Sequence, residues 1–213
     1  EFIKKYDDFL KKIKKEYIEL SFVRHAKTSM NKKNIFLGIK NDPNIIDVKK
    51  KKINRIRYDY IITSDLKRAK QSSKLFFSKK ILHNKLINEI DYGNVDGMSY
   101  EILKKKYPNI IKSWKNKIDI KFPNGENLND VKKRVKKFLN YLRKFKKGSK
   151  ILIISHSFFL RVFISLILNT NLKMAHKINI DHLIVFQFLK KGNFLFPNFN
   201  RLKIEKIYRD IYG

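Results

Sequence analysis

The sequence predicts a single α/β domain built in three layers, with a mostly parallel central sheet and helices on both faces. Short apolar segments typical of buried strands alternate with longer amphipathic segments typical of helices, and this alternation characterises parallel sheets. The 213 residues contain no linker, internal repeat or low-complexity block that would divide the chain. A chain of this length can also bury a substantial core, so one domain is expected.

The first predicted elements are a helix and a strand. In residues 1–15 apolar side chains recur at helical spacing among lysines, which indicates an N-terminal amphipathic helical extension over residues 1–16. Its basic polar face leaves a second interpretation open, a helix lying on a membrane surface. Residues 17–23 predict a strand, and the domain proper is expected to span residues 17–213. Residues 32–57 are rich in lysine and predict a loop with one irregular helix.

The alternation continues through the middle of the chain. Residues 60–63 predict a buried strand, residues 66–77 a helix and residues 81–86 a further strand. Ser99 is a suitable N-cap for the next helix, which Pro108 would end because the residue before a proline avoids the helical conformation.

A long helix is expected over residues 127–145. Asn127 is followed three residues later by Asp130, which resembles an N-cap with an acidic partner, and Gly148 would stop the helix.

The remaining segments complete the predicted sheet. Residues 151–154 are the clearest buried strand in the chain, and residues 158–168 predict the helix that follows it. Residues 182–188 alternate weakly and predict an edge strand.

Composition excludes several classes of protein. The chain has no cysteine, which rules out a disulfide framework, a thiolate metal site and a catalytic thiol. No apolar run reaches the ~18 residues that cross a bilayer, and the N-terminus lacks the order of segments of a signal peptide. We therefore expect a cytoplasmic protein.

The charge is strongly positive, with 50 Lys and Arg against 19 Asp and Glu. Such an excess is found in proteins that bind nucleic acid, anionic membranes or phosphorylated substrates. However, Lys, Ile, Asn, Phe and Tyr are all abundant and all have AT-rich codons, so base composition explains the charge more simply. The lysines are also scattered along the chain, and no specific nucleic-acid partner is predicted.

The candidate site lies where predicted strands end. One strand leads into Arg24 and His25, a second leads into His156, and a third leads into a helix with Arg68 on its first turn. Ligands of open α/β sheets bind beyond the carboxyl ends of the strands, so neighbouring strands would gather two histidines and two arginines in one pocket. Arginine suits a phosphate dianion because its fork donates several hydrogen bonds. Histidine can act as a nucleophile toward phosphorus, and the leaving alkoxide then needs a proton from a carboxylic acid.

Five segments resemble, in the family's order, the motifs of the histidine phosphatase superfamily, which is also called phosphoglycerate-mutase-like. They are RHAKTSMN at residues 24–31, SDLKRA at 64–69, NEIDYG at 88–93, PNGE at 123–126 and SHSFFLR at 155–161. Two departures stand out, because Ala26 and Ser157 each replace a glycine that is usual after the family's histidines.

The resemblance implies roles for individual residues. It implies His25 as the phosphorylated nucleophile, with Arg24, Arg68 and His156 binding the phosphoryl group. It implies Glu89 as the general acid and then the general base, with Asp91 and Asp96 as possible substitutes. The candidate substrate-binding residues are Thr28, Asn31, Gly38 and Ser157. The family's basic reaction uses no metal, and no cofactor is predicted.

The acidic segment looks closer to the phosphatases of the family than to its mutases. We therefore expect hydrolysis of a small phosphorylated metabolite or sugar phosphate. Two alternatives stay open: a cofactor-dependent phosphoglycerate mutase, and an inactive relative that holds polyanions on its basic surface. The other histidines, His83, His176 and His182, are interpreted as structural.

Overall fold

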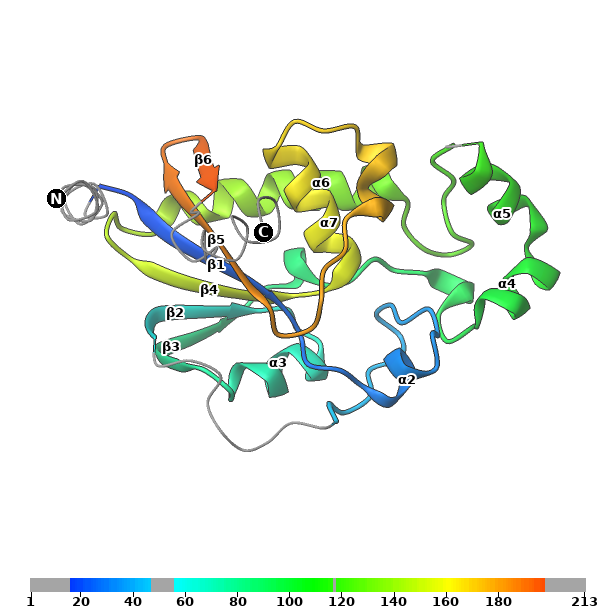
Figure 1. Ribbon diagram of the computed structural model, residues 1–213, viewed down its shortest axis with the longest axis horizontal. Coiled ribbons are helices and arrows are strands. Elements are labelled where there is room, and N and C mark those ends of the chain that lie inside the picture. The colour runs from blue at the N-terminus through cyan, green and yellow to red at the C-terminus, as the bar shows by residue number, and fades with distance from the viewer. Residues whose placement is uncertain (1–15, 47–55, 117, 198–213) are drawn as a thin grey trace, which may run out of the picture.

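The computed structural model describes residues 16–46, 56–116 and 118–197 (Figure 1). Its centre is a six-stranded sheet in the order β3-β2-β4-β1-β5-β6. The strands are β1 (Ile18–Arg24), β2 (Arg57–Thr63), β3 (Phe77–His83), β4 (Lys150–Ser155), β5 (Val185–Lys191) and β6 (Phe194–Pro197). The first four are parallel to one another, and β5 and β6 are antiparallel additions. The predicted α/β fold with a mostly parallel sheet is confirmed.

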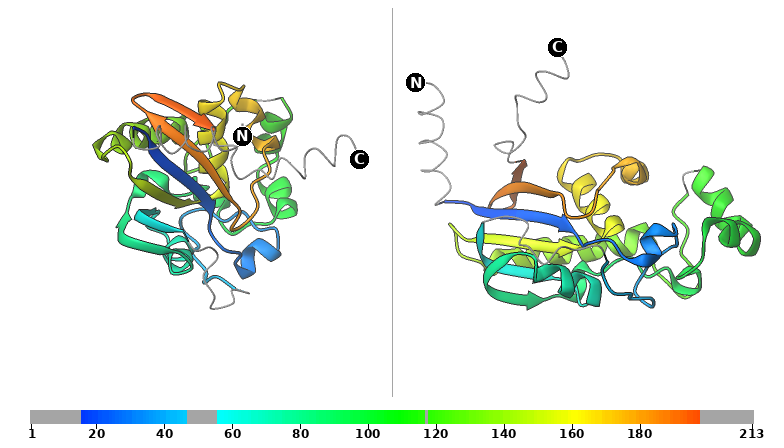
Figure 2. Two further views of the ribbon diagram at one scale, coloured as in Figure 1. Left: turned by 60° about the vertical axis from the view of Figure 1, so that its left-hand side comes forward. Right: turned by 60° about the horizontal axis from the view of Figure 1, so that its bottom comes forward.

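Helices cover both faces of this sheet. The α-helices of the described residues are α2 (Ser29–Lys32), α3 (Lys67–Ser73), α4 (Tyr100–Lys106), α5 (Pro108–Lys115), α6 (Leu128–Tyr141) and α7 (Ser157–Ile167), and α4 and α5 lie beyond one end of the sheet (Figure 1). The views of Figures 1 and 2 place α6 and α7 on one face and α3 on the other. Strand β4 contributes side chains to the apolar clusters on both faces of the sheet, because alternate side chains of a strand point to opposite faces. Ile151 and Ile153 belong to the larger apolar cluster with α6 and α7, and Leu152 and Ile154 to the smaller one with α3.

Helix α3 is shorter than predicted, and the strand after it begins earlier. The hydroxyls of Ser72 and Ser73 donate to the carbonyls of Arg68 and Lys70, which competes with continuation of the helix. Strand β3 then starts at Phe77 and not at residue 81. It lies at the end of the sheet and is largely exposed, so its side chains carry little apolar periodicity.

One further expectation was wrong. The segment 182–188 was expected at an edge, but β5 lies between β1 and β6 because the chain reverses at Gly192 and adds a last strand. Two helix ends agree with the sequence. Helix α4 ends at Lys106, before Pro108, which then begins α5, where a first-turn proline sacrifices no hydrogen bond. The long helix α6 ends at Tyr141 and passes into a tighter turn over residues 142–144, close to the predicted end at residue 145.

Two sequence expectations fall largely outside the described residues. They are the helical extension, of which residue 16 alone is described, and part of the segment 32–57. In the part of that segment that is described, α2 ends at Lys32 and no irregular helix follows. None of the helices in the described ranges is both long and apolar enough to span a bilayer.

The sheet brings three strand ends to one place. In the parallel pair β1 and β4, Arg24 lies opposite Ser155, and in the pair β2 and β4, Thr63 lies opposite Ile154. The residues that follow these positions therefore emerge side by side at one edge of the sheet. This is the edge at which parallel sheets bind ligands.

Candidate active site

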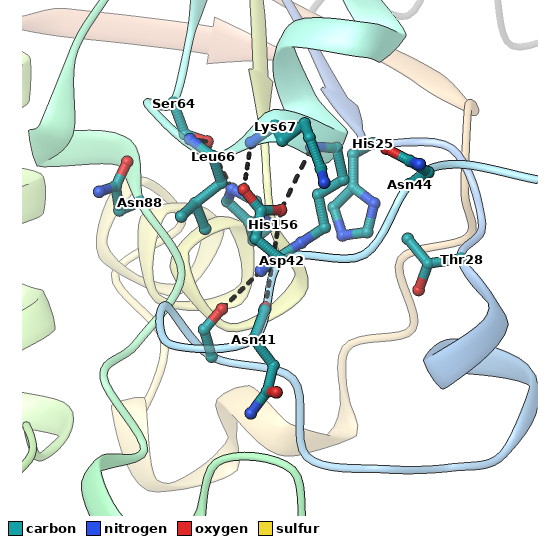
Figure 3. A network of polar contacts seen from close by, with 12 residues as sticks. His25, Thr28, Asn41, Asp42, Asn44, Ser64, Leu66, Lys67, Asn88 and His156 are labelled. Atoms are coloured by element: carbon teal, nitrogen blue, oxygen red, sulfur yellow. Dashed lines mark hydrogen bonds and ion pairs between the residues drawn. The ribbon is translucent and has the colours of Figure 1, made fainter.

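The two strand-end histidines lie against each other. His25 follows β1 and His156 follows β4, and the centroids of their rings are 4.9 Å apart. Both side chains are buried, with 2% and 0% of their surface exposed. Figure 3 shows the pair together with Ser64, the residue that follows β2. The structure thus brings together the ends of three different strands.

His25 has a defined tautomer. Its Nδ1 lies 2.7 Å from the carbonyl oxygen of Ala26, which can only accept, so the proton is on Nδ1 and Nε2 keeps its lone pair. Burial, and then the positive charge of Arg68, lower the pKa of His25 well below its ordinary value. The ring is therefore neutral near pH 7. A neutral imidazole with a bare Nε2 is a competent nucleophile.

His156 is held by one of its two ring nitrogens. Its Nε2 lies 2.6 Å from the Oγ of Ser64, and its buried Nδ1 has no partner among the described residues. Burial and the charge of Arg68 lower the pKa of this ring too. A nearby dianion would favour its protonated form, which could donate a hydrogen bond from Nδ1.

Two buried arginines flank the histidines. The guanidinium of Arg68 is fully buried and donates to the carbonyls of Gly38 and Asn41 at 2.7 and 3.1 Å. It also pairs with Asp42 at 3.1 Å. Arg24 donates to the carbonyl of Ile180 at 3.0 Å. Burial is the main cause that lowers the pKa of both arginines, and each remains charged because its ordinary pKa is so high.

Most of the buried polar atoms that lack a partner in the described residues belong to this site. Five buried side-chain polar atoms of the described residues have no hydrogen-bond partner, and three are Arg24 Nε, Arg68 Nε and His156 Nδ1. Buried polar groups without partners are rare and costly, so their coincidence points to a ligand. A ligand rich in acceptor oxygens, such as a phosphoryl group, would satisfy all three.

A loop before α3 holds Arg68 in place. The carboxylate of Asp96 accepts hydrogen bonds from the backbone N–H groups of Gly38, Lys40 and Asn41 and from the Asn41 side chain. A Cβ at position 38 would lie 2.7 Å from Asp96 Oδ2, so only glycine fits there. The Gly38 carbonyl thus accepts a hydrogen bond that positions Arg68. The contact of Gly38 with substrate stays a prediction. The Asp96 carboxylate is thus used to order this loop, which argues against Asp96 as the general acid.

Glu89 lies at the N-terminus of α7. Its carboxylate accepts hydrogen bonds from the backbone N–H groups of Phe158, at 3.1 and 3.3 Å to the two oxygens, and of Phe159, at 3.3 Å. The positive end of a helix dipole favours a carboxylate here. The side chain is 6% exposed, and its charge acts on both Arg24 and Arg68. Asp91, by contrast, is used to accept from the Gly93 N–H.

Comparison with known proteins agrees with this geometry. The sequence model of the histidine phosphatase superfamily (branch 1) matches residues 20–192. The chain belongs to the histidine phosphatase superfamily. The resemblance found in the five motifs is thereby confirmed.

Relatives of this superfamily member carry both mutase and phosphatase names. It is 27% identical over 192 residues to a 2,3-bisphosphoglycerate-dependent phosphoglycerate mutase of Allorhizobium ampelinum, covering 76% of this chain and 90% of that protein. It is 28% identical over 176 residues to phosphoserine phosphatase 1 of Hydrogenobacter thermophilus, covering 78% and 83%. Identity at this level leaves the acceptor of the phosphoryl group open.

Solved structures confirm the fold of the superfamily. Bacillus stearothermophilus YhfR superposes with a TM-score of 0.74 at 16% identity, over 84% of this chain and 95% of that one. The alpha-ribazole phosphatase of Shigella flexneri superposes with a TM-score of 0.72 at 19% identity, over 84% and 94%.

Two of the motif residues in this histidine phosphatase superfamily member bond to each other. The Thr28 hydroxyl donates to Asn31 Oδ1 at 2.9 Å and accepts from the Asn31 N–H at 3.3 Å, which caps α2. Their contact with phosphate stays a prediction. Ser157 is the first residue of α7, so its N–H lies at the helix end where backbone donors have no intrahelical partner.

Sequence reasoning missed a third histidine of the site. The Nδ1–H of His182 donates to the carbonyl of His25 at 2.6 Å, and the rings of the two residues meet edge to face with centroids 5.3 Å apart. Burial, followed by the charge of Arg24, lowers the pKa of His182 to about 4. His182 is separated from the nearest motif, so no local pattern marked it.

Arg134 was missed for the same reason. It donates to the carbonyls of Leu86, Asn88 and Glu89 and forms a two-pronged ion pair with Glu126 at 2.7 and 2.8 Å. Glu126 in turn accepts from the Asp91 N–H at 3.0 Å. Together the pair clamps the segment that carries the Glu89 carboxylate. An arginine in a lysine-rich helix is usually exposed, so the sequence did not indicate this contact.

Proposed function

We propose that the protein hydrolyses phosphomonoesters through a phosphohistidine on His25, without a metal ion. The observation that carries the proposal is the neutral His25 ring with an unprotonated Nε2, in the same site as three buried nitrogens that lack partners among the described residues. A nucleophile and a set of donors for phosphoryl oxygens in one buried place are the two requirements of phosphoryl transfer to a side chain.

In the first step, His25 Nε2 attacks the phosphorus atom and the bond from phosphorus to the ester oxygen breaks. The leaving alkoxide takes a proton from Glu89, and the product alcohol departs. Arg24, Arg68 and His156 donate to the equatorial oxygens, together with the Ser157 N–H. In enzymes whose transition state develops negative charge, a single such donor stabilises that state by about 3 kcal/mol.

In the second step, water replaces the alcohol. Glu89, now ionised, accepts a proton from the water as its oxygen attacks phosphorus. The bond between phosphorus and Nε2 then breaks, which releases inorganic phosphate and restores the neutral ring of His25. Two smaller barriers thus replace one large barrier.

The second candidate function is phosphoglycerate mutase. It is favoured by the names of the curated relatives, which are 26–29% identical and include several mutases. In a mutase the phosphoryl group on His25 would pass to a phosphoglycerate hydroxyl and not to water.

The test is release of inorganic phosphate from 4-nitrophenyl phosphate in the presence of EDTA. We expect turnover by the wild type and none by His25→Ala. His83→Ala is the matched control, because His83 is exposed on β3 and bonds to Thr63. A brief reaction quenched in alkali should trap phosphate on the wild-type chain, since a phosphoramidate resists base and is cleaved by acid.

Three results would contradict the proposal. Turnover by His25→Ala at the wild-type rate would remove His25 from the nucleophile role. Faster conversion of 3-phosphoglycerate to 2-phosphoglycerate in the presence of 2,3-bisphosphoglycerate than release of phosphate would make the protein a mutase. A folded wild type without either activity would identify it as an inactive relative.

A further inference from the structure

A cavity of about 350 Å³ lies against the first turn of α7, the helix that follows His156. Its volume is at the small end of ligand pockets, enough for an organic group of the size of one or two rings. The lining residues are mainly apolar and aromatic. They include Phe36, Ile90, Tyr92, Trp114, Phe122 and Phe158.

The cavity adjoins Glu89. Ile90 follows Glu89 in the chain, and Phe158, whose N–H binds the Glu89 carboxylate, lines the cavity as well. Burial raises the pKa of Tyr92 above its usual range, and the charge of Glu89 raises it further, which places the Tyr92 hydroxyl in the field of that carboxylate. The proposed acid is therefore in contact with the wall of the cavity. The organic part of an ester whose oxygen faces Glu89 would extend into this space.

The cavity wall is a cluster of aromatic rings. The Tyr92 ring lies 5.4 Å from that of Phe36 and 5.0 Å from that of Phe122, and the Trp114 ring lies 5.9 Å from both. Trp114 and Ile118 are 37% and 56% exposed. An apolar ligand in the cavity would remove part of this surface from water, which is favourable in proportion to its area.

Polar side chains in the wall are those of Tyr92, Asp119, Arg161, Lys173 and His176. Arg161 donates from Nε to the carbonyl of Ile178 at 2.8 Å, and His176 Nδ1 lies 2.9 Å from the carbonyl oxygen of Lys173. The Asp119 carboxylate accepts from the N–H groups of Leu128 and Asn129.

The lysines of α4 and α5 do not contribute to this wall, and the lysine that does is Lys173. Lys104, Lys105, Lys106 and Lys112 are exposed on α4 and α5 and are absent from the cavity lining. A sugar or glycerate group would exchange its hydrogen bonds with water for contacts with aromatic carbon, which costs free energy.

We propose that the cavity binds the organic part of the substrate and selects a large apolar, typically aromatic, phosphomonoester over sugar phosphates and phosphoglycerates. This inference rests on the proposed function, because it assumes that phosphoryl transfer takes place at His25. It also replaces the expectation of a sugar phosphate as the preferred substrate.

The test compares 2-phenylethyl phosphate with glycerol 1-phosphate. Both are esters of primary alcohols, so their leaving groups have similar reactivity and the comparison isolates the organic part. We expect kcat/KM to be at least about tenfold higher for the phenylethyl ester, which is the range of discrimination that apolar pockets achieve. Trp114→Ala and Ile118→Ser should each lower this ratio at least about fivefold.

Ile102→Ser is the matched control. Ile102 is 45% exposed on α4 and does not line the cavity, so its substitution should leave the ratio unchanged. Circular dichroism and the midpoint of urea unfolding establish that each variant is folded. A ratio near one in the wild type, or a ratio that Trp114→Ala and Ile118→Ser leave unchanged, would overturn the inference while hydrolysis stands. If the wild type cleaves neither ester nor 4-nitrophenyl phosphate, the proposed function itself fails.

Discussion

Glu89 and Phe158 are 69 positions apart in the chain, yet both carboxylate oxygens of Glu89 accept from the N–H of Phe158. This contact joins the acidic motif to the helix that follows the second histidine. It holds the carboxyl group at the N-terminus of α7, the helix whose N-cap is His156. The predictions below concern this residue and the groups that position the site.

Replacing Glu89 by glutamine should remove the proton donor and keep an acceptor for the α7 amides. We expect kcat on an alkyl phosphate to fall about 10²–10⁴-fold, the usual contribution of a general acid. The loss should be much smaller for 2,4-dinitrophenyl phosphate in a burst experiment, since its leaving group needs no proton. Asp91→Asn is the matched control. An equal loss for both esters would show that Glu89 acts in some other way.

Replacing Arg134 by methionine should misplace the Glu89 segment, because three carbonyls and Glu126 lose their donor. We expect kcat on an alkyl phosphate to fall about tenfold or more, again with a smaller loss for an ester with a good leaving group. Lys133→Met, on the same helix, is the control because Lys133 is exposed and pairs with Asp130 alone among described residues. Equal losses for the two kinds of ester would leave Arg134 a structural role only.

Replacing His182 by alanine should loosen the backbone at His25, because the donor to the His25 carbonyl is lost. We expect a reduction of kcat of about tenfold with little change in KM for phosphate esters. His182→Asn, which retains a side-chain N–H, should recover most of the activity. Wild-type kcat in His182→Ala would contradict the positioning role.

Acidification should destabilise the folded protein between about pH 6.5 and pH 4. Folding lowers the pKa values of His25 and His156 well below 6.5 and that of His182 to about 4, so the unfolded chain binds more protons in this range. The stabilising contribution is therefore complete above the unfolded pKa of about 6.5 and is lost as pH falls toward the folded values.

The midpoint of urea unfolding at pH 7.5, 6 and 5 measures this effect. We expect the midpoint to fall steadily over that range, and to fall less in His182→Asn than in the wild type. The exposed His176 provides the control, since His176→Asn should keep the wild-type slope. A midpoint that does not change between pH 7.5 and pH 5 would contradict neutral buried histidines.

The sheet and the histidine pair could be predicted because their signals are local. The apolar segment at residues 151–154 and the residues directly after it form one stretch of chain, and the same holds for residues 17–25. The end strand β3, the start of α5 at Pro108 and the inner position of β5 were not predictable in this way. Each depends on a partner elsewhere in the chain, and in β3 an exposed surface leaves almost no pattern.

The sequence by itself determined the superfamily, the class of fold and the identity of the residues that meet at the strand ends. Buried parallel strands must place their carboxyl ends at one edge, so His25 and His156 had to lie close together once their strands were neighbours. Only the tertiary structure decided that Glu89, and not Asp91 or Asp96, faces α7, and that the wall beside it is aromatic in a lysine-rich segment. The direction of a side chain depends on packing against residues far away in the chain, so it cannot be predicted from the local sequence or from composition.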